Sequence, residues 1–204
     1  NDRSAGAGGD MLQQLQALSL PLALLAAAIA LVYMPSLGAS FQFDDWNVIV
    51  RDPRVQSLAA WLASMPGTRP LLKLSFALNH ELGDGAASFR AVNVLVHALN
   101  ALLVGALLRG FGLRLALAPR AAGFAALVGA TLFALHPVQT EAVTYVSGRS
   151  SSLSTLLALL ALAAWLRGLD APDERRWRWI SCAVFALALG VKEAAYDAKQ
   201  HAVI

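Results

Sequence analysis

The stretch LSLPLALLAAAIALVYM, residues 18–34, decides the fold class of this chain. No Asp, Glu, Lys or Arg occurs between Met11 and Phe43, and a helix built from this apolar core can cross roughly 30 Å of hydrocarbon. We interpret it as a first transmembrane helix over about residues 18–35. A signal peptide is the alternative. It is disfavoured because no basic segment lies close to the apolar core and no small-x-small cleavage motif follows cleanly before Phe41.

The composition of the whole chain also indicates a membrane protein. Of its 204 residues, 57% are hydrophobic and 14% are charged, with a mean hydropathy of +0.57, whereas about 25% of residues in a soluble domain are charged. The net charge is +3, and the basic residues lie between apolar runs without interleaved aromatics, which excludes nucleic acid as a partner. The single cysteine, Cys182, lies in an apolar run, so the sequence has no disulfide framework.

Further apolar runs predict four more transmembrane helices. These helices are expected at about residues 91–108, 121–137, 150–166 and 177–191. The last run is short, so it needs Trp177 and a snorkelling Arg178 to reach across the bilayer. The predicted fold is all-α, a polytopic membrane protein with about five spans. It comprises a flexible lead-in at 1–17, a membrane domain at 18–193 and a polar tail at 194–204.

The distribution of Lys and Arg predicts the orientation of these spans. The connections 109–120 and 167–178 carry seven arginines, and basic residues are enriched in cytoplasmic connections. By contrast, the long loop 36–90 has five basic residues balanced by five acids, and the connection 136–149 has only Arg149. We therefore predict a cytoplasmic amino terminus and place both of these loops on the extracytoplasmic side. The high content of Ala and Leu is typical of a bacterial inner membrane protein.

Loop 36–90 is too long for a simple turn and too apolar for a disordered linker. Its segment PRVQSLAAWLASM, residues 53–65, is predicted to form an amphipathic helix on the membrane surface. Two adjacent acids, Asp44 and Asp45, lie near the start of the loop. One interpretation is a general base that takes a proton from an acceptor hydroxyl, with its neighbour tuning the pKa or joining a cation site. The alternative is a pair of solvated interfacial charges or a helix cap.

A second polar cluster lies in HPVQTEAVTYVSGRS, residues 136–150. It contains His136, Glu141 and Arg149, which are predicted to share one face of the membrane. An arginine there can hold a phosphate, because the guanidinium offers a planar fork to the phosphate oxygens. The alternative is a capped connection between two spans, with a salt bridge between Glu141 and Arg149.

A third cluster, Asn93, His97 and Asn100, lies within a predicted span. The spacings of four and three residues put these side chains on one helical face. Polar groups at membrane depth seldom face lipid, so the stripe is expected to face other helices or a cavity. It then forms either interhelical hydrogen bonds or a ligand contact. Lys192 and Glu193, in GVKEAA, are predicted to reach the same side as the first two clusters because spans alternate in direction.

Five motifs occur in a characteristic order within about residues 20–193. They are FQFDDWNVIVRDPRV, TRPLLKLSFALNHEL, FRAVNVLVHALNALLV, FALHPVQTEAVTYVSGRSSSLSTL and VKE. In these motifs the chain resembles the amino-terminal membrane region of the transmembrane O-mannosyltransferases with tetratricopeptide repeats and their bacterial relatives, which belong to the GT-C class of glycosyltransferases. The resemblance implies an integral membrane enzyme that transfers a sugar from a polyprenyl-phosphate carrier. The acceptor is a hydroxyl group, of a protein Ser or Thr or of a glycan or lipid, on the extracytoplasmic face.

The resemblance also implies roles for residues at matching positions. Asp44, with Asp45 beside it, matches an acid that acts as the catalytic base. The positions expected to bind the carrier phosphate are Arg69, Arg149 and Lys192, because a leaving phosphate needs positively charged donors. The positions expected to support them are His136, Glu141, Glu193, Asn93 and His97.

Activity and cofactor are left open by other features of the sequence. Relatives in this family generally continue into more spans and a tetratricopeptide array, so we expect this chain to be a truncated form or one subunit of a split enzyme. It also has Ser151 where many relatives have Asp. The alternative function is a non-catalytic membrane subunit that binds lipid or a partner; a transporter is disfavoured because no two related halves are visible. A divalent cation is compatible with the donors Asp44, Asp45, His136 and Glu141.

Overall fold

The computed structural model describes residues 21–65 and 67–192, and every regular element within these ranges is a helix. The elements are a first helix over the described residues 21–33, η1 (Met34–Gly38), η2 (Trp46–Val50), η3 (Pro53–Val55), α2 (Leu58–Ala63), α3 (Pro70–Leu82), α4 (Ala86–Arg114), α5 (Pro119–Leu135), α6 (Gln139–Thr144), η4 (Val146–Gly148), α7 (Arg149–Asp170) and α8 (Glu174–Lys192). The predicted all-α fold is confirmed. The lead-in 1–17, the tail 194–204 and Glu193 lie outside the described residues.

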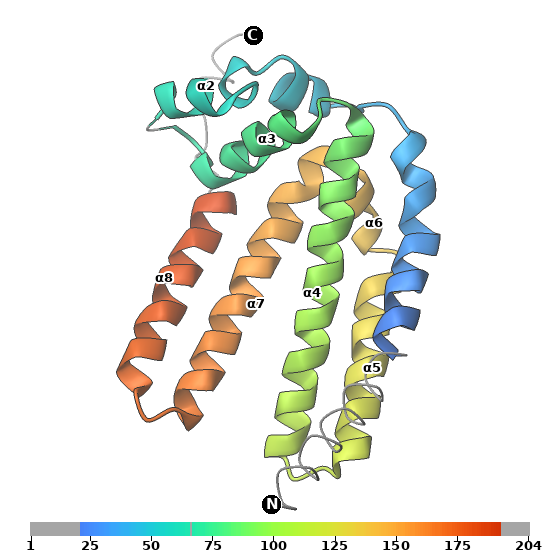
Figure 1. Ribbon diagram of the computed structural model, residues 1–204, viewed down its shortest axis with the longest axis vertical. Coiled ribbons are helices and arrows are strands. Elements are labelled where there is room, and N and C mark those ends of the chain that lie inside the picture. Colours follow the sequence, from blue (N-terminus) through green and yellow to red (C-terminus); the bar gives the residue numbers. More distant parts are fainter. Residues whose placement is uncertain (1–20, 66, 193–204) are drawn as a thin grey trace, which may run out of the picture.

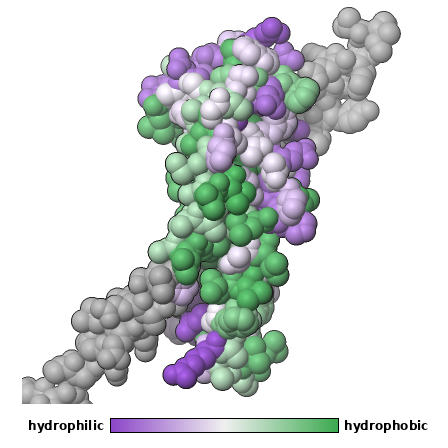
Figure 2. Space-filling model, turned by 90° about the vertical axis from the view of Figure 1, so that its right-hand side faces the viewer, coloured by the Kyte–Doolittle hydropathy of each residue, from purple (hydrophilic) through white to green (hydrophobic). Residues whose placement is uncertain are grey.

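Five long helices form a bundle: the first helix, α4, α5, α7 and α8 (Figure 1). Three segments are long and apolar enough to cross a membrane, namely Pro21–Gly38, Ala86–Arg114 and Val146–Asp170. α5 is apolar but shorter, with 17 residues, and α8 has 19. Hydrophobic residues gather over the middle of the molecule in Figure 2, and hydrophilic residues gather towards its upper end. This pattern fits an all-α membrane protein.

Small residues bring α4 and α5 close together. α5 buries one alanine per turn, at Ala122, Ala126, Ala130 and Ala134. A Cβ atom added to Gly105 of α4 would lie 3.2 Å from the Cβ of Ala130, and one added to Gly112 would lie 3.1 Å from that of Ala122. Helices in lipid associate through such close packing, because the bilayer removes the hydrophobic drive between them. The repeated alanine therefore explains how α5 packs without large side chains.

The segment between the first helix and α4 folds across one end of the bundle, where α2 and α3 lie (Figure 1). Its apolar side chains share a buried cluster with α4, η4 and α8, made of Ile49, Val55, Leu72, Phe76, Phe89, Val146 and Val191. The prediction of a single helix over residues 53–65 is wrong. The chain forms η3 and then α2, because the side chain of Ser57 starts a new helix by accepting a hydrogen bond from the Ala60 N–H (3.1 Å).

Candidate functional site

Asp44 and Asp45 are neighbours in sequence but have opposite environments. Asp45 has no exposed surface. Its Oδ1 accepts hydrogen bonds from the N–H and the hydroxyl of Ser147, at 2.9 and 2.7 Å, and its Oδ2 accepts one from the Gln42 N–H at 3.1 Å. Asp44 is exposed, and its backbone N–H donates to the hydroxyl of Tyr145 at 3.1 Å. Asp45 therefore ties the loop after η1 to the loop before α7, and the Asp44 carboxylate stays accessible.

The turn that carries Asp44 is strained at the preceding residue. Phe43 has a φ of 44°, a left-handed conformation that is rare for a bulky side chain. Its ring is 83% exposed and meets Tyr145 edge to face, with 6.5 Å between ring centroids. Burial raises the pKa of the Tyr145 phenol above its usual value, so this hydroxyl is neutral at physiological pH. Strained backbone of this kind is found preferentially at functional sites.

Arg149 lies in the interior of the same end of the bundle, with no exposed surface. Its guanidinium donates to Asn93 Oδ1 (2.7 Å), Asn79 Oδ1 (2.7 Å) and the carbonyl oxygens of Ser75 (3.1 Å) and Phe89 (2.8 Å). These partners belong to α3 and α4. The environment differs from the one expected for a phosphate contact, because the donors are directed at protein acceptors. Arg149 instead joins α7 to α3 and α4.

Arg90 is a second buried arginine, although the sequence predicts only a charge at the end of loop 36–90. It is 1% exposed. Its Nε donates to the carbonyl oxygen of Thr144 at 2.9 Å, and its terminal nitrogens donate to the carbonyl oxygens of Ala39 and Ser40. The position of Arg90 in the sequence could have indicated this burial. Arg90 lies three residues before Asn93, on the same face of α4 as the polar stripe.

The stripe of α4 forms interhelical hydrogen bonds, which was one of the two interpretations of its spacing. All three side chains are buried. Each of them meets a different neighbouring segment. The partners are Tyr145 O for Asn93 (3.1 Å), Ala134 O for His97 (2.9 Å) and Ser152 O for Asn100 (2.9 Å). The central helix is thus tied to α5, to the segment before η4 and to α7 by polar contacts.

Two exposed basic residues lie at the contact between α3 and α8. A Cβ atom added to Gly190 of α8 would lie 3.6 Å from the Cδ1 of Leu71 on α3. Arg69 precedes Leu71 by two residues, at the start of α3, and Lys192 follows Gly190 by two residues. Both residues are exposed. The fold therefore brings two of the sequence-predicted phosphate contacts to neighbouring ends of α3 and α8.

His136 and Glu141 do not join this group of basic residues. Both are exposed, and the Nδ1 of His136 accepts a hydrogen bond from the Val138 N–H at 3.2 Å. Glu141 lies in the first turn of α6, and no ion pair between it and Arg149 forms in the structure. Across residues 21–65 and 67–192, no three His, Cys, Asp or Glu side chains converge as a metal site would require.

Comparison with known proteins identifies relatives of this chain. No family profile and no solved structure matches it. Protein O-mannosyl-transferase Tmtc2 of Drosophila melanogaster is 32% identical over 198 residues, which is 86% of this chain and 20% of that protein. Protein O-mannosyl-transferase TMTC1 of Mus musculus is 36% identical over 170 residues, 72% of this chain and 17% of that protein.

A third relative has a similar identity and covers a similar share of this chain. Protein O-mannosyl-transferase TMTC4 of Homo sapiens is 31% identical over 203 residues, 83% of this chain and 27% of that protein. The chain spans only about a fifth to a quarter of the length of these relatives. Over most of its own length, the chain is therefore similar to a region of the TMTC protein O-mannosyl-transferases.

Proposed function

We propose that this chain is part of a membrane glycosyltransferase that moves mannose from a polyprenyl-phosphate carrier to a hydroxyl group of a protein. The names of the relatives support the sugar and the class of acceptor. The chemistry is supported by the bundle end that carries Asp44, where this accessible acid occurs together with the exposed basic residues Arg69 and Lys192. Its extracytoplasmic location is part of the proposal, because arginines are concentrated at the opposite end.

The single observation that carries the proposal is the contrast between Asp44 and its surroundings. The turn is fixed on both sides, by the backbone bond to Tyr145 and by the buried carboxylate of Asp45. The Asp44 carboxylate itself is accessible. In the proposed step it accepts the proton of the acceptor hydroxyl while that oxygen attacks the anomeric carbon. The bond from the sugar to the carrier phosphate breaks, and the phosphate leaves with the electron pair. A positioned base of this kind contributes about 10²–10⁴-fold in rate.

We assign the stabilisation of the leaving phosphate to Arg69 and Lys192. Positively charged donors placed where negative charge develops are among the strongest contributors to catalysis. Arg149 is given a different role, because its guanidinium already serves four protein acceptors. It holds α3 against α4 and α7, and it thereby positions the start of α3, where Arg69 lies.

The test is transfer of radiolabelled mannose from polyprenyl-phosphate mannose to a Ser/Thr peptide by the purified protein in lipid vesicles. We expect Arg69→Gln and Lys192→Gln each to raise the KM for the donor several-fold, because each removes a charge from the phosphate site. The matched control is Arg176→Gln, an exposed arginine at the opposite end, which should leave the KM unchanged. If a folded protein neither binds nor turns over the donor, the alternative of a non-catalytic lipid- or partner-binding subunit replaces this proposal.

A further inference from the structure

An apolar groove lies between the first helix, α4 and α5. Its volume is about 430 Å³. The walls include Leu22, Gly105, Gly123 and Ala126, and Arg109 is the only charged residue among the described residues that line it. On α4 and α5 its lining residues lie between Ala101 and Arg109 and between Gly123 and Ala130, so the groove lies towards the end of the bundle where α4 finishes and α5 begins.

Small residues are the reason that the groove is hollow. Further along the first helix, Ile29 and Tyr33 pack tightly against Ala130 and Ala134 in one buried cluster. Nearer the start of α5, a Cβ atom added to Gly123 would meet no atom of residues 21–65 or 67–192 within 4 Å. Two of the helices that form the walls belong to segments long and apolar enough to cross a membrane. The groove therefore opens at hydrocarbon depth, where the surrounding molecules are lipid chains.

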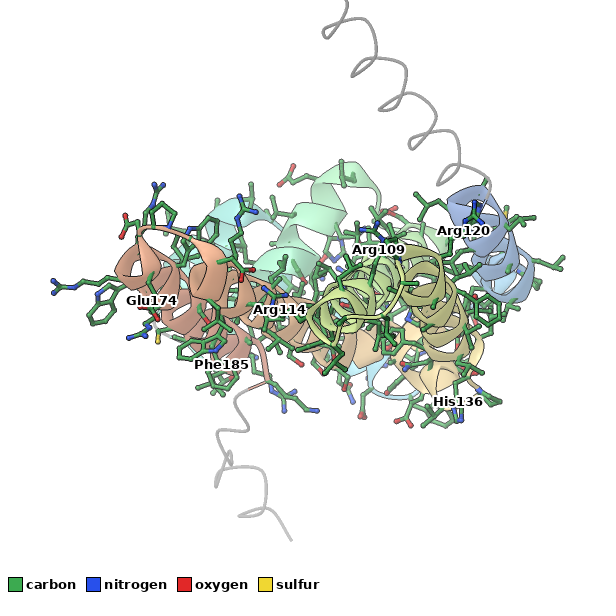
Figure 3. The ribbon with its side chains drawn as sticks, turned by 90° about the horizontal axis from the view of Figure 1, so that it is seen from below. Arg109, Arg114, Arg120, His136, Glu174 and Phe185 are labelled. Atoms are coloured by element: carbon green, nitrogen blue, oxygen red, sulfur yellow. The ribbon has the colours of Figure 1, made fainter. Side chains whose placement is uncertain are left out.

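Arg109 is among the residues that line this groove, and Arg120 lies near it at the start of α5. Arg109 follows Gly105 by four residues on α4, and Arg120 precedes Gly123 by three residues on α5, so each lies on the groove face of its helix. Both are exposed, and Figure 3 shows both on the side of the bundle where the first helix lies. Among the described residues, no hydrogen bond or ion pair joins the guanidinium of Arg109 or of Arg120 to another residue. Arg114, at the same end, is paired with Asp170.

We propose that this groove binds an anionic phospholipid of the membrane, with an acyl chain between the first helix, α4 and α5 and its phosphate between Arg109 and Arg120. The two arginines are the reason for an acidic headgroup, because a net-neutral headgroup leaves their charge uncompensated. Basic pockets between transmembrane helices bind acidic headgroups in this way. The site is at the opposite end from Asp44, so this proposal does not rest on the proposed glycosyl transfer.

The test is native mass spectrometry of the whole protein released from nanodiscs that contain equal amounts of phosphatidylglycerol and phosphatidylcholine. We expect wild-type protein to retain phosphatidylglycerol in several-fold excess. The double variant Arg109→Gln/Arg120→Gln should lose this preference. Gly123→Leu should reduce the retained lipid several-fold, because its side chain enters the groove while its Cβ meets no atom of the described residues.

Two control variants separate the site from general effects. Arg176→Gln removes an exposed charge at the same end, and Gly85→Leu adds a side chain where the structure also has open space; both should retain lipid as wild type does. The proposal is overturned if wild-type protein shows no preference for phosphatidylglycerol, or if the double arginine variant keeps that preference. Unchanged retention in a folded Gly123→Leu variant would also overturn it, since another occupant, such as residues 1–20 of the chain, would then fill the groove.

Discussion

The two ends of the helix bundle differ in whether they bury charged residues. The end that carries Asp44 has exposed charged residues, such as Arg69 and Lys192, but it also buries Asp45, Arg90 and Arg149, which are hydrogen-bonded to several segments. At the other end, arginines are exposed and form at most surface pairs, such as the pair of Arg114 with Asp170. Buried polar contacts specify one arrangement of loops, whereas surface pairs contribute little. The difference indicates that buried hydrogen bonds fix the loops around Asp44, whereas the arginines of the opposite end remain exposed to solvent or lipid headgroups.

The largest difference between the two ends is expected from removing a paired arginine at each. Arg149→Met should destabilise the protein by about 3–5 kcal/mol, because it leaves the buried acceptors on Asn79 and Asn93 without a donor. Arg114→Met should cost about 1 kcal/mol or less, because its pair with Asp170 is exposed. Thermal unfolding of both variants in the same detergent measures the difference. Equal losses would contradict the contrast between the ends.

A smaller effect is expected from adding a methyl group at each end. A Cβ atom at Gly148 would lie 2.4 Å from the carbonyl oxygen of Glu141 and 3.1 Å from the Cα of Ala142. Gly148→Ala should therefore destabilise the protein by about 1–3 kcal/mol, as overpacking does. Gly123→Ala, where a Cβ atom meets no neighbour among the part of the chain that the structure describes, should leave stability unchanged or raise it slightly through helix propensity. If chemical denaturation gives both variants the same midpoint, the close packing around η4 is not what holds this end.

The smallest effect is expected from lowering the pH. It should reduce the stability of the protein through His80, which lies at the end that carries Asp44. His80 of α3 packs edge to face on Phe89, and its Nε2 is buried without a hydrogen-bond partner in the structure. Burial lowers the pKa of His80, although the charges of Asp84 and Glu81 oppose this. Below a pH of about 6.5, His80 takes up a proton in the unfolded chain but not in the folded protein. The free energy of unfolding therefore decreases as the pH falls, until the pH reaches the pKa of His80 in the folded protein.

His80→Gln removes this titration, so the melting temperature of this variant should depend less on pH between 7 and 5 than that of wild type. His136→Gln is the control, because His136 is exposed, and it should keep the wild-type slope. A wild-type slope in His80→Gln would show that other groups carry the acid sensitivity.

The fold could be predicted well from the apolar runs, because each long helix of the bundle contains an uncharged apolar run. α4 was predicted at 91–108 but runs from Ala86 to Arg114. The difference arises because Arg90 is buried by contacts with distant loops and Arg114 is paired with Asp170. Neither partner is visible from the sequence near the helix. The predicted helix is therefore too short at both ends, because its limits were placed at charged residues.

The candidate site could be predicted only in part. The spacing of Asn93, His97 and Asn100 correctly indicated a face directed at other helices, because helical periodicity is local information. Adjacency did not reveal that Asp45 is buried and Asp44 exposed, because Ser147, which binds Asp45, is about a hundred residues away in the chain. The same limit applies to the buried acceptors of Arg149. Long-range hydrogen bonds decide which charged residues are structural, and only the fold brings their partners together.

The most direct test of this account compares the two neighbouring acids, with mannose transfer and melting temperature measured in the same preparations. Asp44→Asn should lower the rate of transfer about 10²–10⁴-fold and keep the wild-type melting temperature. Asp45→Asn should lower the melting temperature, because an amide nitrogen cannot accept the hydrogen bonds from Gln42 and Ser147 that the carboxylate accepts with both oxygens. Wild-type transfer by a folded Asp44→Asn protein would contradict the account, because the accessible acid would then have no part in the chemistry.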